Sequence, residues 1–201
     1  MFTMAGEWNI VESNPCRGVL RAPEPKRMRY VQDHEFWAVH KECSPMLKLA
    51  MELALLTGLR RGDLLNLTRD SVTDDGLLVH TSKTGKSLIF DWTDELREVI
   101  SKAQAIPPQV RRVIICTRQG KEYTPTGFSA VWRCAVQRAL KSGELKEPFR
   151  LNDLRSKSAS DDADVDRASN RLGHSSRQMT ESFYILTPKK CSHYSGILDN
   201  R

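Results

Sequence analysis

Apolar residues recur at helical spacing along most of the chain, and the strongest case follows Pro45. Leu49, Leu53 and Leu56 stand at i, i+4 and i+7, a pattern typical of the buried face of an α-helix. Proline is tolerated at the first helical position, so Pro45 marks the start of this helix. Gly58 then ends it. The pattern therefore predicts a helix that lies in the core.

Similar signals predict most of the remaining structure. Further helices are expected at residues 33–40 with Asp33 as N-cap, 61–67, 93–105 with Thr93 as N-cap, 126–140, 151–160, 164–172 and 177–185. Two β-like runs, 77–81 and 87–90, flank a turn that contains Gly85 and predict an antiparallel hairpin. Residues 113–116 predict one short buried strand. The expected fold class is thus mainly α with a small antiparallel β-hairpin.

Length and composition narrow the class of protein. The 201 residues suffice for one domain with a sizeable core. No run of 18 apolar residues occurs, which predicts no membrane-spanning helix, and the first residues lack the basic and apolar regions of a secretory signal. The five cysteines are scattered without a Cys-x-x-Cys pair, which argues against a disulfide framework or a zinc site. These features favour a reduced, cytosolic protein.

Residues 1–30 differ from the rest because prolines interrupt any helical period and basic residues are frequent. Trp8 and Ile10 suggest the end of a helix. We expect this stretch to be a basic connector that follows a missing N-terminal domain of a longer protein.

The positive charge is concentrated in one segment. The chain carries a net charge of +6, and residues 109–141 contain seven basic residues against one acidic residue, which equals that whole excess. A local basic field favours a polyanion such as DNA, although an ordinary solvated surface is the alternative. The candidate DNA-binding residues, four of them on the predicted helix 126–140 or just after it, are Arg111, Arg112, Arg118, Lys121, Arg133, Gln137, Arg138 and Lys141.

Several dispersed residues have side chains that suit a phosphate group. Arg60 follows Thr57-Gly58-Leu59, and Asp63, three residues later, is placed to hold its guanidinium in one rotamer. A fixed arginine fork suits two phosphate oxygens better than a mobile lysine does. Arg155 follows Asn152 at the same spacing, and Gly173 allows a close backbone approach before His174.

Each of these residues also has an ordinary structural interpretation. An isolated arginine often caps a carbonyl, and a histidine is often satisfied by a backbone oxygen. Lys83, with Lys86 as a close rival, is a turn lysine, and Tyr184 fits the edge of a core.

Taken in order, however, the set resembles the active-site pattern of the tyrosine recombinases, the phage integrase family. The matching stretches are Thr57-Gly58-Leu59-Arg60 with Asp63, Ser82-Lys83-Thr84-Gly85, Asn152-Asp153-Leu154-Arg155, Leu172-Gly173-His174 and Tyr184. Asn14-Pro15-x-x-Gly18-Val19 is similar to the junction after the family's N-terminal DNA-clamping domain. The resemblance covers nearly the whole chain.

This resemblance implies the fold, the activity and the partners. It implies a tyrosine recombinase catalytic domain at residues 31–201 that cleaves and rejoins DNA through a 3′-phosphotyrosyl intermediate. Tyr184 would attack, Arg60, Arg155, His174 and Asn152 would hold the phosphate, and Lys83 would protonate the leaving 5′-oxygen. No metal or cofactor is implied. The implied partner is double-stranded DNA, bound by a homotetramer that is weakly associated or monomeric without DNA, with accessory DNA-bending proteins, in the cytoplasm of a bacterial host.

Two departures leave alternatives open. Asn152 stands where the family usually has histidine, and an amide cannot exchange a proton near neutral pH. Tyr184 lies ten residues after His174, whereas Phe183 occupies the commoner position nine residues on. The alternative functions are a type IB topoisomerase, which shares the phosphotyrosine chemistry, and an inactive helical DNA-binding module.

Overall fold

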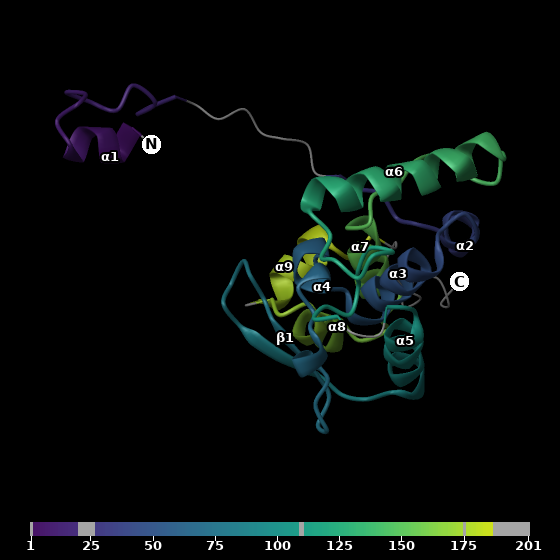
Figure 1. Ribbon diagram of the computed structural model, residues 1–201. Helices are drawn as coiled ribbons and strands as arrows, with labels where there is room; N and C mark the ends of the chain where they lie inside the picture. The colour runs from purple at the N-terminus through teal and green to yellow at the C-terminus, as the bar shows by residue number, and fades with distance from the viewer. Residues whose placement is uncertain (1, 20–26, 109–110, 175, 187–201) are drawn as a thin grey trace, which may run out of the picture.

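The structure is a computed structural model that describes residues 2–19, 27–108, 111–174 and 176–186. Its elements are α1 (Phe2–Glu7), α2 (Asp33–Lys41), α3 (Pro45–Thr57), α4 (Arg61–Leu65), the 3₁₀ turn η1 (Arg69–Ser71), β1 (Leu77–His80), β2 (Ser87–Phe90), α5 (Asp94–Ala105), α6 (Pro125–Lys141), α7 (Asp153–Ser160), α8 (Val165–Arg171) and α9 (Arg177–Phe183). The fold class predicted from the sequence is confirmed: the described chain is mainly helical and carries one small antiparallel hairpin (Figure 1).

The predicted core helix α3 lies at the centre of the body. Ala50, Met51 and Leu53 on this helix are completely buried. Helices α2, α5 and α7 all pack against α3, and α6 packs against α2 along one side of the body (Figure 1). Burial of this apolar face is the main stabilising contribution to the fold. No described helix has both the length and the apolar character needed to cross a membrane.

The hairpin forms as its sequence predicts. Strands β1 and β2 pair in antiparallel register from Leu77 opposite Phe90 to His80 opposite Ser87. Leu77 and Val79 alternate inward and are buried, which fixes the register because a slip of one residue would expose both. The turn that joins the strands extends away from the helical body (Figure 1).

Three local predictions need correction. Residues 113–116 are buried but form only two isolated bridges, Thr68 with Val113 and Cys116 with Glu122, so this stretch is not a strand. Gln32, not Asp33, is the N-cap of α2, because the Glu35 carboxylate accepts the Gln32 backbone N–H at 2.9 Å. The helix expected over 61–67 ends at residue 65.

Candidate active site

The end of α3 brings two distant parts of the chain together at Gly58. Gly58 has φ +63°, a left-handed conformation that ends the helix and favours glycine. A Cβ atom at this position would stand 2.6 Å from the Leu172 side chain. The glycine therefore provides both the turn that presents Arg60 and the close contact with the segment that precedes His174.

Arg155 joins the turn at Gly58 to the segment that precedes His174. Its side chain is only 4% exposed, and its two terminal nitrogens donate to the carbonyl of Gly58 at 2.5 Å and to that of Leu172 at 2.7 Å. The second of these nitrogens also lies 3.1 Å from His174 Nε2. Burial and the nearby charge of Arg60 lower the pKa of Arg155 from its ordinary value. The Nε atom of Arg155 is buried without a hydrogen-bond partner among the described residues.

His174 is held between Arg155 and Thr180. Its Nδ1 lies 2.7 Å from Thr180 Oγ1, while Nε2 faces the Arg155 guanidinium. Burial first, and then the charges of Arg155, Arg60 and Lys86, lower the pKa of His174 to about 4, so the ring is neutral at pH 7. Because a guanidinium only donates hydrogen bonds, Nε2 must carry the lone pair and Nδ1 the proton. This tautomer is assigned from the hydrogen-bond partners.

Tyr184 follows α9 and lies against both groups. Its ring centroid is 4.7 Å from that of His174 and 5.2 Å from Arg155 Cζ. Ser160, at the end of α7, donates to the Tyr184 carbonyl at 2.9 Å and accepts the Leu186 backbone N–H at 2.8 Å. The neighbouring Phe183 side chain is 51% exposed. Tyr184, and not Phe183, is therefore the aromatic residue that lies against His174 and Arg155.

Arg60 faces the same pocket, but Asp63 does not hold it as expected. Arg60 is partly buried, and its charge acts on both Arg155 and His174. Asp63 is buried, and its Oδ1 accepts the Ser82 backbone N–H and the Ser82 hydroxyl, both at 2.8 Å. No ion pair joins Arg60 to Asp63 in the described structure. Asp63 instead anchors the hairpin turn at the residue just before Lys83.

The lysines of the turn differ in their contacts. Lys83 is exposed and makes no hydrogen bond or ion pair with any other described residue. Lys86, the rival candidate, reaches the Gly173 carbonyl at 3.4 Å, and its charge contributes to the low pKa of His174. Asn152 is exposed and stands immediately before α7, where its side chain makes no capping hydrogen bond. Arg155 and His174 are thus in direct contact, whereas the exposed side chains of Lys83 and Asn152 make no hydrogen bond with either of them in the described structure, and their part in the site stays a prediction.

The basic segment divides into one buried arginine and several exposed residues. Arg111 is only 8% exposed, and its guanidinium donates to the carbonyl of Ala103 in the last turn of α5 and to those of Ile106 and Pro108 just after it, so it is not available to DNA. This expectation from the sequence is wrong. The residues that remain exposed are Arg112, Arg118, Lys121, Arg133, Gln137, Arg138 and Lys141.

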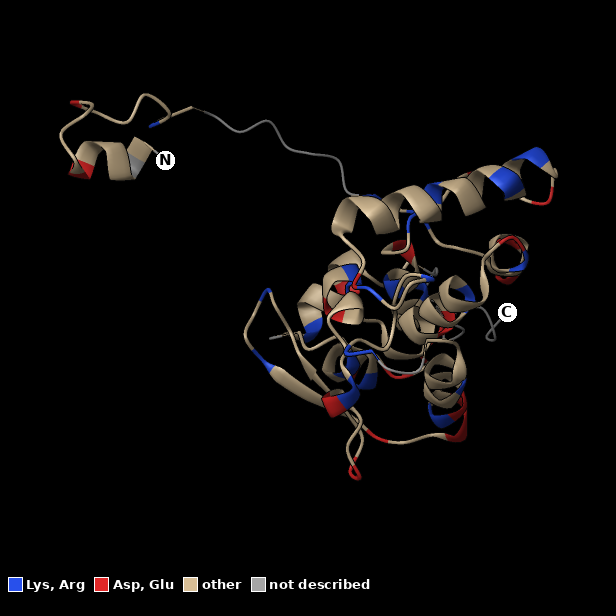
Figure 2. Cartoon of the chain, in the orientation of Figure 1, with Lys and Arg blue, Asp and Glu red and all other residues tan. Residues whose placement is uncertain are grey.

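Some of these exposed residues also make polar contacts within the protein. Arg138 donates to the Glu42 carbonyl at 2.6 Å, and Arg112 lies 3.6 Å from the Glu122 carboxylate. Arg133 and Gln137 line a groove of about 680 Å³ between α6 and residues 148–152, which Asn152 also lines. Basic residues lie along α6 and in the hairpin (Figure 2). Their contact with DNA stays a prediction.

Three residues of the site have partners that the sequence does not indicate. Thr180, Ser160 and Ser82 hold His174, the backbone at Tyr184 and the hairpin, respectively. Each is a common helix or turn residue, and only the folded chain shows its partner. Within the described ranges, no group of three or more His, Cys, Asp or Glu side chains is arranged to hold a metal ion.

The comparisons with known proteins agree with this geometry. The phage integrase family profile matches residues 29–190. The integrase of Mycobacterium phage D29 is 25% identical over 206 aligned positions, covering 91% of this chain and 54% of the relative, and that of Enterobacteria phage 434 is 30% identical over 162 positions, covering 74% and 44%. The chain thus spans about half the length of the curated relatives it matches.

Solved structures give the same result. The lambda integrase catalytic core is 29% identical with a TM-score of 0.60, covering 74% of this chain and 96% of that one. A lambda integrase tetramer bound to a Holliday junction is 25% identical with a TM-score of 0.71, covering 96% and 58%. Because the family profile extends over most of the residues, this chain belongs to the phage integrase family.

Proposed function

We propose that this chain is the catalytic domain of a site-specific DNA recombinase, which cleaves and rejoins DNA through a 3′-phosphotyrosyl intermediate to integrate or excise mobile DNA. One observation carries the proposal. Arg155, His174 and Tyr184, separated by up to 29 positions in the sequence, meet with a 3.1 Å contact and a 4.7 Å ring separation. A phenol beside a guanidinium and an unprotonated imidazole has the components of a nucleophile acting on a phosphodiester.

The reaction is a transesterification in which one bond replaces another. The Tyr184 oxygen attacks the phosphorus, the new P–O bond to tyrosine forms, and the bond to the 5′-oxygen breaks. Lys83 supplies the proton that the departing oxygen takes up, a contribution on the order of 10²–10⁴-fold in rate. The 5′-hydroxyl later attacks the phosphotyrosine and restores the DNA strand, so the bond energy is conserved.

Arg60 and Arg155 stabilise the negative charge that develops on the non-bridging oxygens. A preorganised donor of this kind contributes about 3–4 kcal/mol to lowering the barrier. Arg155 is held in place before DNA binds by two carbonyls, and the backbone turn after Gly58 presents Arg60. Asn152 adds a hydrogen bond from its amide to the phosphate.

The acid–base role of the residue that Asn152 replaces passes to His174 or Lys83. Asn152 cannot perform it because an amide does not exchange protons near neutral pH. The low pKa of His174, about 4, leaves Nε2 unprotonated at pH 7. Since a low pKa also makes His174 a weak base, the phenolic proton passes to His174 or to solvent as the bond to phosphorus forms.

The exposed basic side chains of residues 112–141 hold the DNA backbone. Such contacts give affinity without choosing a sequence. Each neutralised phosphate contributes about 0.9 to the slope of log affinity against log salt concentration. We assign residues 1–30 to a basic connector and residues 31–201 to the catalytic domain. The enzyme acts on double-stranded DNA in the bacterial cytoplasm, as a tetramer like the lambda integrase assembly on a Holliday junction.

Covalent capture on nicked DNA tests the proposal. The chain is incubated with a pool of duplexes that carry randomised sequence around a nick, so that the short 5′-hydroxyl fragment diffuses away after cleavage. We expect a protein–DNA adduct that survives detergent and is absent from Tyr184→Phe but present in the matched control Phe183→Leu. Plasmid relaxation without strand exchange would indicate a topoisomerase. DNA binding without any adduct would indicate the inactive binding module.

A further inference from the structure

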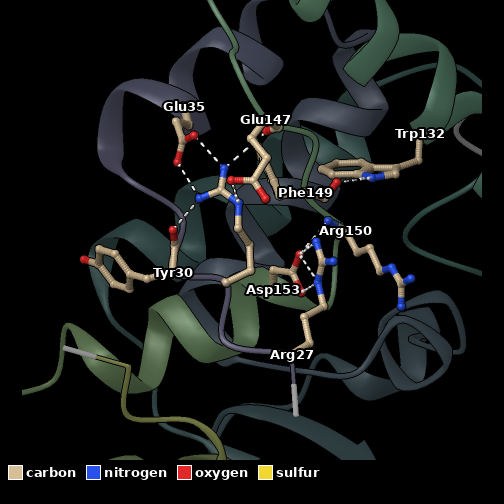
Figure 3. A network of polar contacts seen from close by, with 9 residues as sticks. Arg27, Tyr30, Glu35, Trp132, Glu147, Phe149, Arg150 and Asp153 are labelled. Carbon is tan, nitrogen blue, oxygen red and sulfur yellow. Dashed lines mark hydrogen bonds and ion pairs between the residues drawn. The ribbon is translucent and has the colours of Figure 1, made fainter. Parts of the chain in front are cut away.

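The first turn of α7 has a second set of contacts, made by Asp153. Asp153, the first residue of the helix, lies between Asn152 and Arg155 in sequence and is 7% exposed. Arg27 donates to both of its carboxylate oxygens, from Nε at 3.1 and 3.2 Å and from a terminal nitrogen at 2.9 Å (Figure 3). This two-pronged geometry fixes the direction of both side chains.

The same carboxylate also closes the turn that leads into α7. Asp153 Oδ2 accepts the Arg150 backbone N–H at 2.8 Å, and the Asp153 backbone N–H donates to the Arg150 carbonyl at 2.9 Å (Figure 3). One side chain therefore joins the incoming turn, the first turn of the helix and residue 27. If Arg27 were removed, the carboxylate would lose three of the four hydrogen bonds that hold it.

Two further polar contacts join the same two segments of the chain. Arg29 binds the Glu35 carboxylate at 2.5 and 3.0 Å and the Glu147 carbonyl at 3.2 Å. Lys157, on α7, is buried and lies 2.5 Å from Asp33. Residues 27–35 are thus tied at three points to residues 147–157. The Arg27–Asp153 tie is the one next to the catalytic residues.

We propose that Arg27 and Asp153 are positioning residues, whose ion pair sets the first turn of α7 and thereby the placement of Asn152 and Arg155 in the pocket. The pair contributes little to the stability of the fold, because the Arg27 side chain is 42% exposed and exposed ion pairs are weak. Its effect is on geometry. A displacement of a catalytic group by about 1 Å can cost about 100-fold in rate.

This inference rests on the proposed function, and single-turnover capture on nicked DNA tests it. At saturating DNA, the amplitude reports the folded fraction and the rate constant reports the positions of the catalytic groups. We expect Arg27→Ala and Asp153→Asn to lower the rate constant about 10- to 100-fold, with Arg27→Lys between them and the wild type. Amplitude should stay unchanged when the reaction is run below the melting transition of every variant.

A matched control separates positioning from loss of a surface charge. Lys41→Ala removes an exposed pair of 2.5 Å with Glu144 that does not touch α7, and should cleave at the wild-type rate. Asp153→Asn leaves every basic residue in place, so equal rate losses in Arg27→Ala and Asp153→Asn, with DNA affinity within twofold, exclude a direct contact between Arg27 and DNA. A rate within twofold of wild type in Arg27→Ala, or a loss of amplitude alone, would overturn the inference.

A second measurement does not depend on cleavage. In nitrogen-15 NMR spectra, the Asn152 side-chain amide and the Arg155 Nε–H should shift in Arg27→Ala and not in Lys41→Ala. Unchanged signals in Arg27→Ala would refute positioning even if the wild type formed no adduct. A wild type without adduct but with shifted signals would refute the proposed function and leave the positioning role supported.

Discussion

Replacing Arg155 by alanine should damage the fold as well as the chemistry. The guanidinium donates to two carbonyls, of Gly58 and Leu172, that belong to segments more than 100 residues apart. Alanine leaves both carbonyls in the interior without this donor. A buried acceptor without a partner costs about 1–3 kcal/mol, so the two together cost about 2–6 kcal/mol.

The lower half of that range is the better expectation. The substitution also removes a buried positive charge that Arg60 repels, which offsets part of the loss. For a domain of this size, each 1 kcal/mol lowers the melting temperature by about 2–4 °C. A loss of about 2–4 kcal/mol, which is a large part of a typical total stability of about 5–15 kcal/mol, should therefore lower the melting temperature by roughly 4–16 °C.

Arg60→Ala provides the comparison. Arg60 faces the same pocket, but its side chain makes no hydrogen bond or ion pair with another described residue, so its loss should leave the melting temperature within about 2 °C, or raise it slightly. Both variants should lose covalent capture. Thermal unfolding and capture are measured on the same preparations. If Arg155→Ala melted within 2 °C of the wild type, the cross-linking role assigned to Arg155 would be wrong.

Other substitutions and conditions test the remaining parts of the site. The folded-state pKa of His174, about 4, lies below its ordinary value of about 6.5. The stability that this shift contributes is therefore fully present above pH 6.5 and should fall as the pH drops towards 4. Urea unfolding and an NMR titration of the ring measure this, and a pKa of about 6.5 in the folded chain would contradict it. Asp63→Asn should slow cleavage about tenfold by loosening the Ser82 anchor of the hairpin. A substrate with sulfur as the leaving atom needs no proton and should restore the rate, whereas a loss that persists would place Asp63 elsewhere in the mechanism. Arg111→Ala should lower the free energy of unfolding by about 1–3 kcal/mol without changing the salt dependence of DNA binding. Arg133→Ala should leave the stability unchanged and reduce the slope of log affinity against log salt concentration by about 0.9. The opposite assignment of the two effects would refute both roles.

The sequence predicts those features that depend on neighbours along the chain. The spacing of Leu49, Leu53 and Leu56 predicts the core helix, and the apolar positions around Gly85 predict the hairpin. Thr93 caps α5 as expected, accepting the Leu96 N–H at 3.2 Å. In each case, the signal and its structural consequence lie within one or two turns.

Features that depend on distant partners could not be predicted in this way. Asp63 was expected to hold Arg60 on one helical face, but Arg60 has an extended backbone and α4 begins only after it. The i, i+3 rule therefore does not apply, and Asp63 is free to bind Ser82, 19 residues away. Similarly, a count of charges cannot distinguish the buried Arg111 from the exposed Arg133. Burial is decided by packing between elements.

The two hydrogen bonds of Ser160 attach the segment that carries Tyr184 to the body of the same chain. These bonds join the backbone on both sides of Ile185 to α7, the helix that carries Arg155. Tyr184 and Arg155 of one chain are therefore held together. A tyrosine donated to a neighbouring subunit would first have to break this attachment. We therefore expect cleavage in cis. A mixture of the Tyr184→Phe and Arg155→Ala variants should not regain covalent capture.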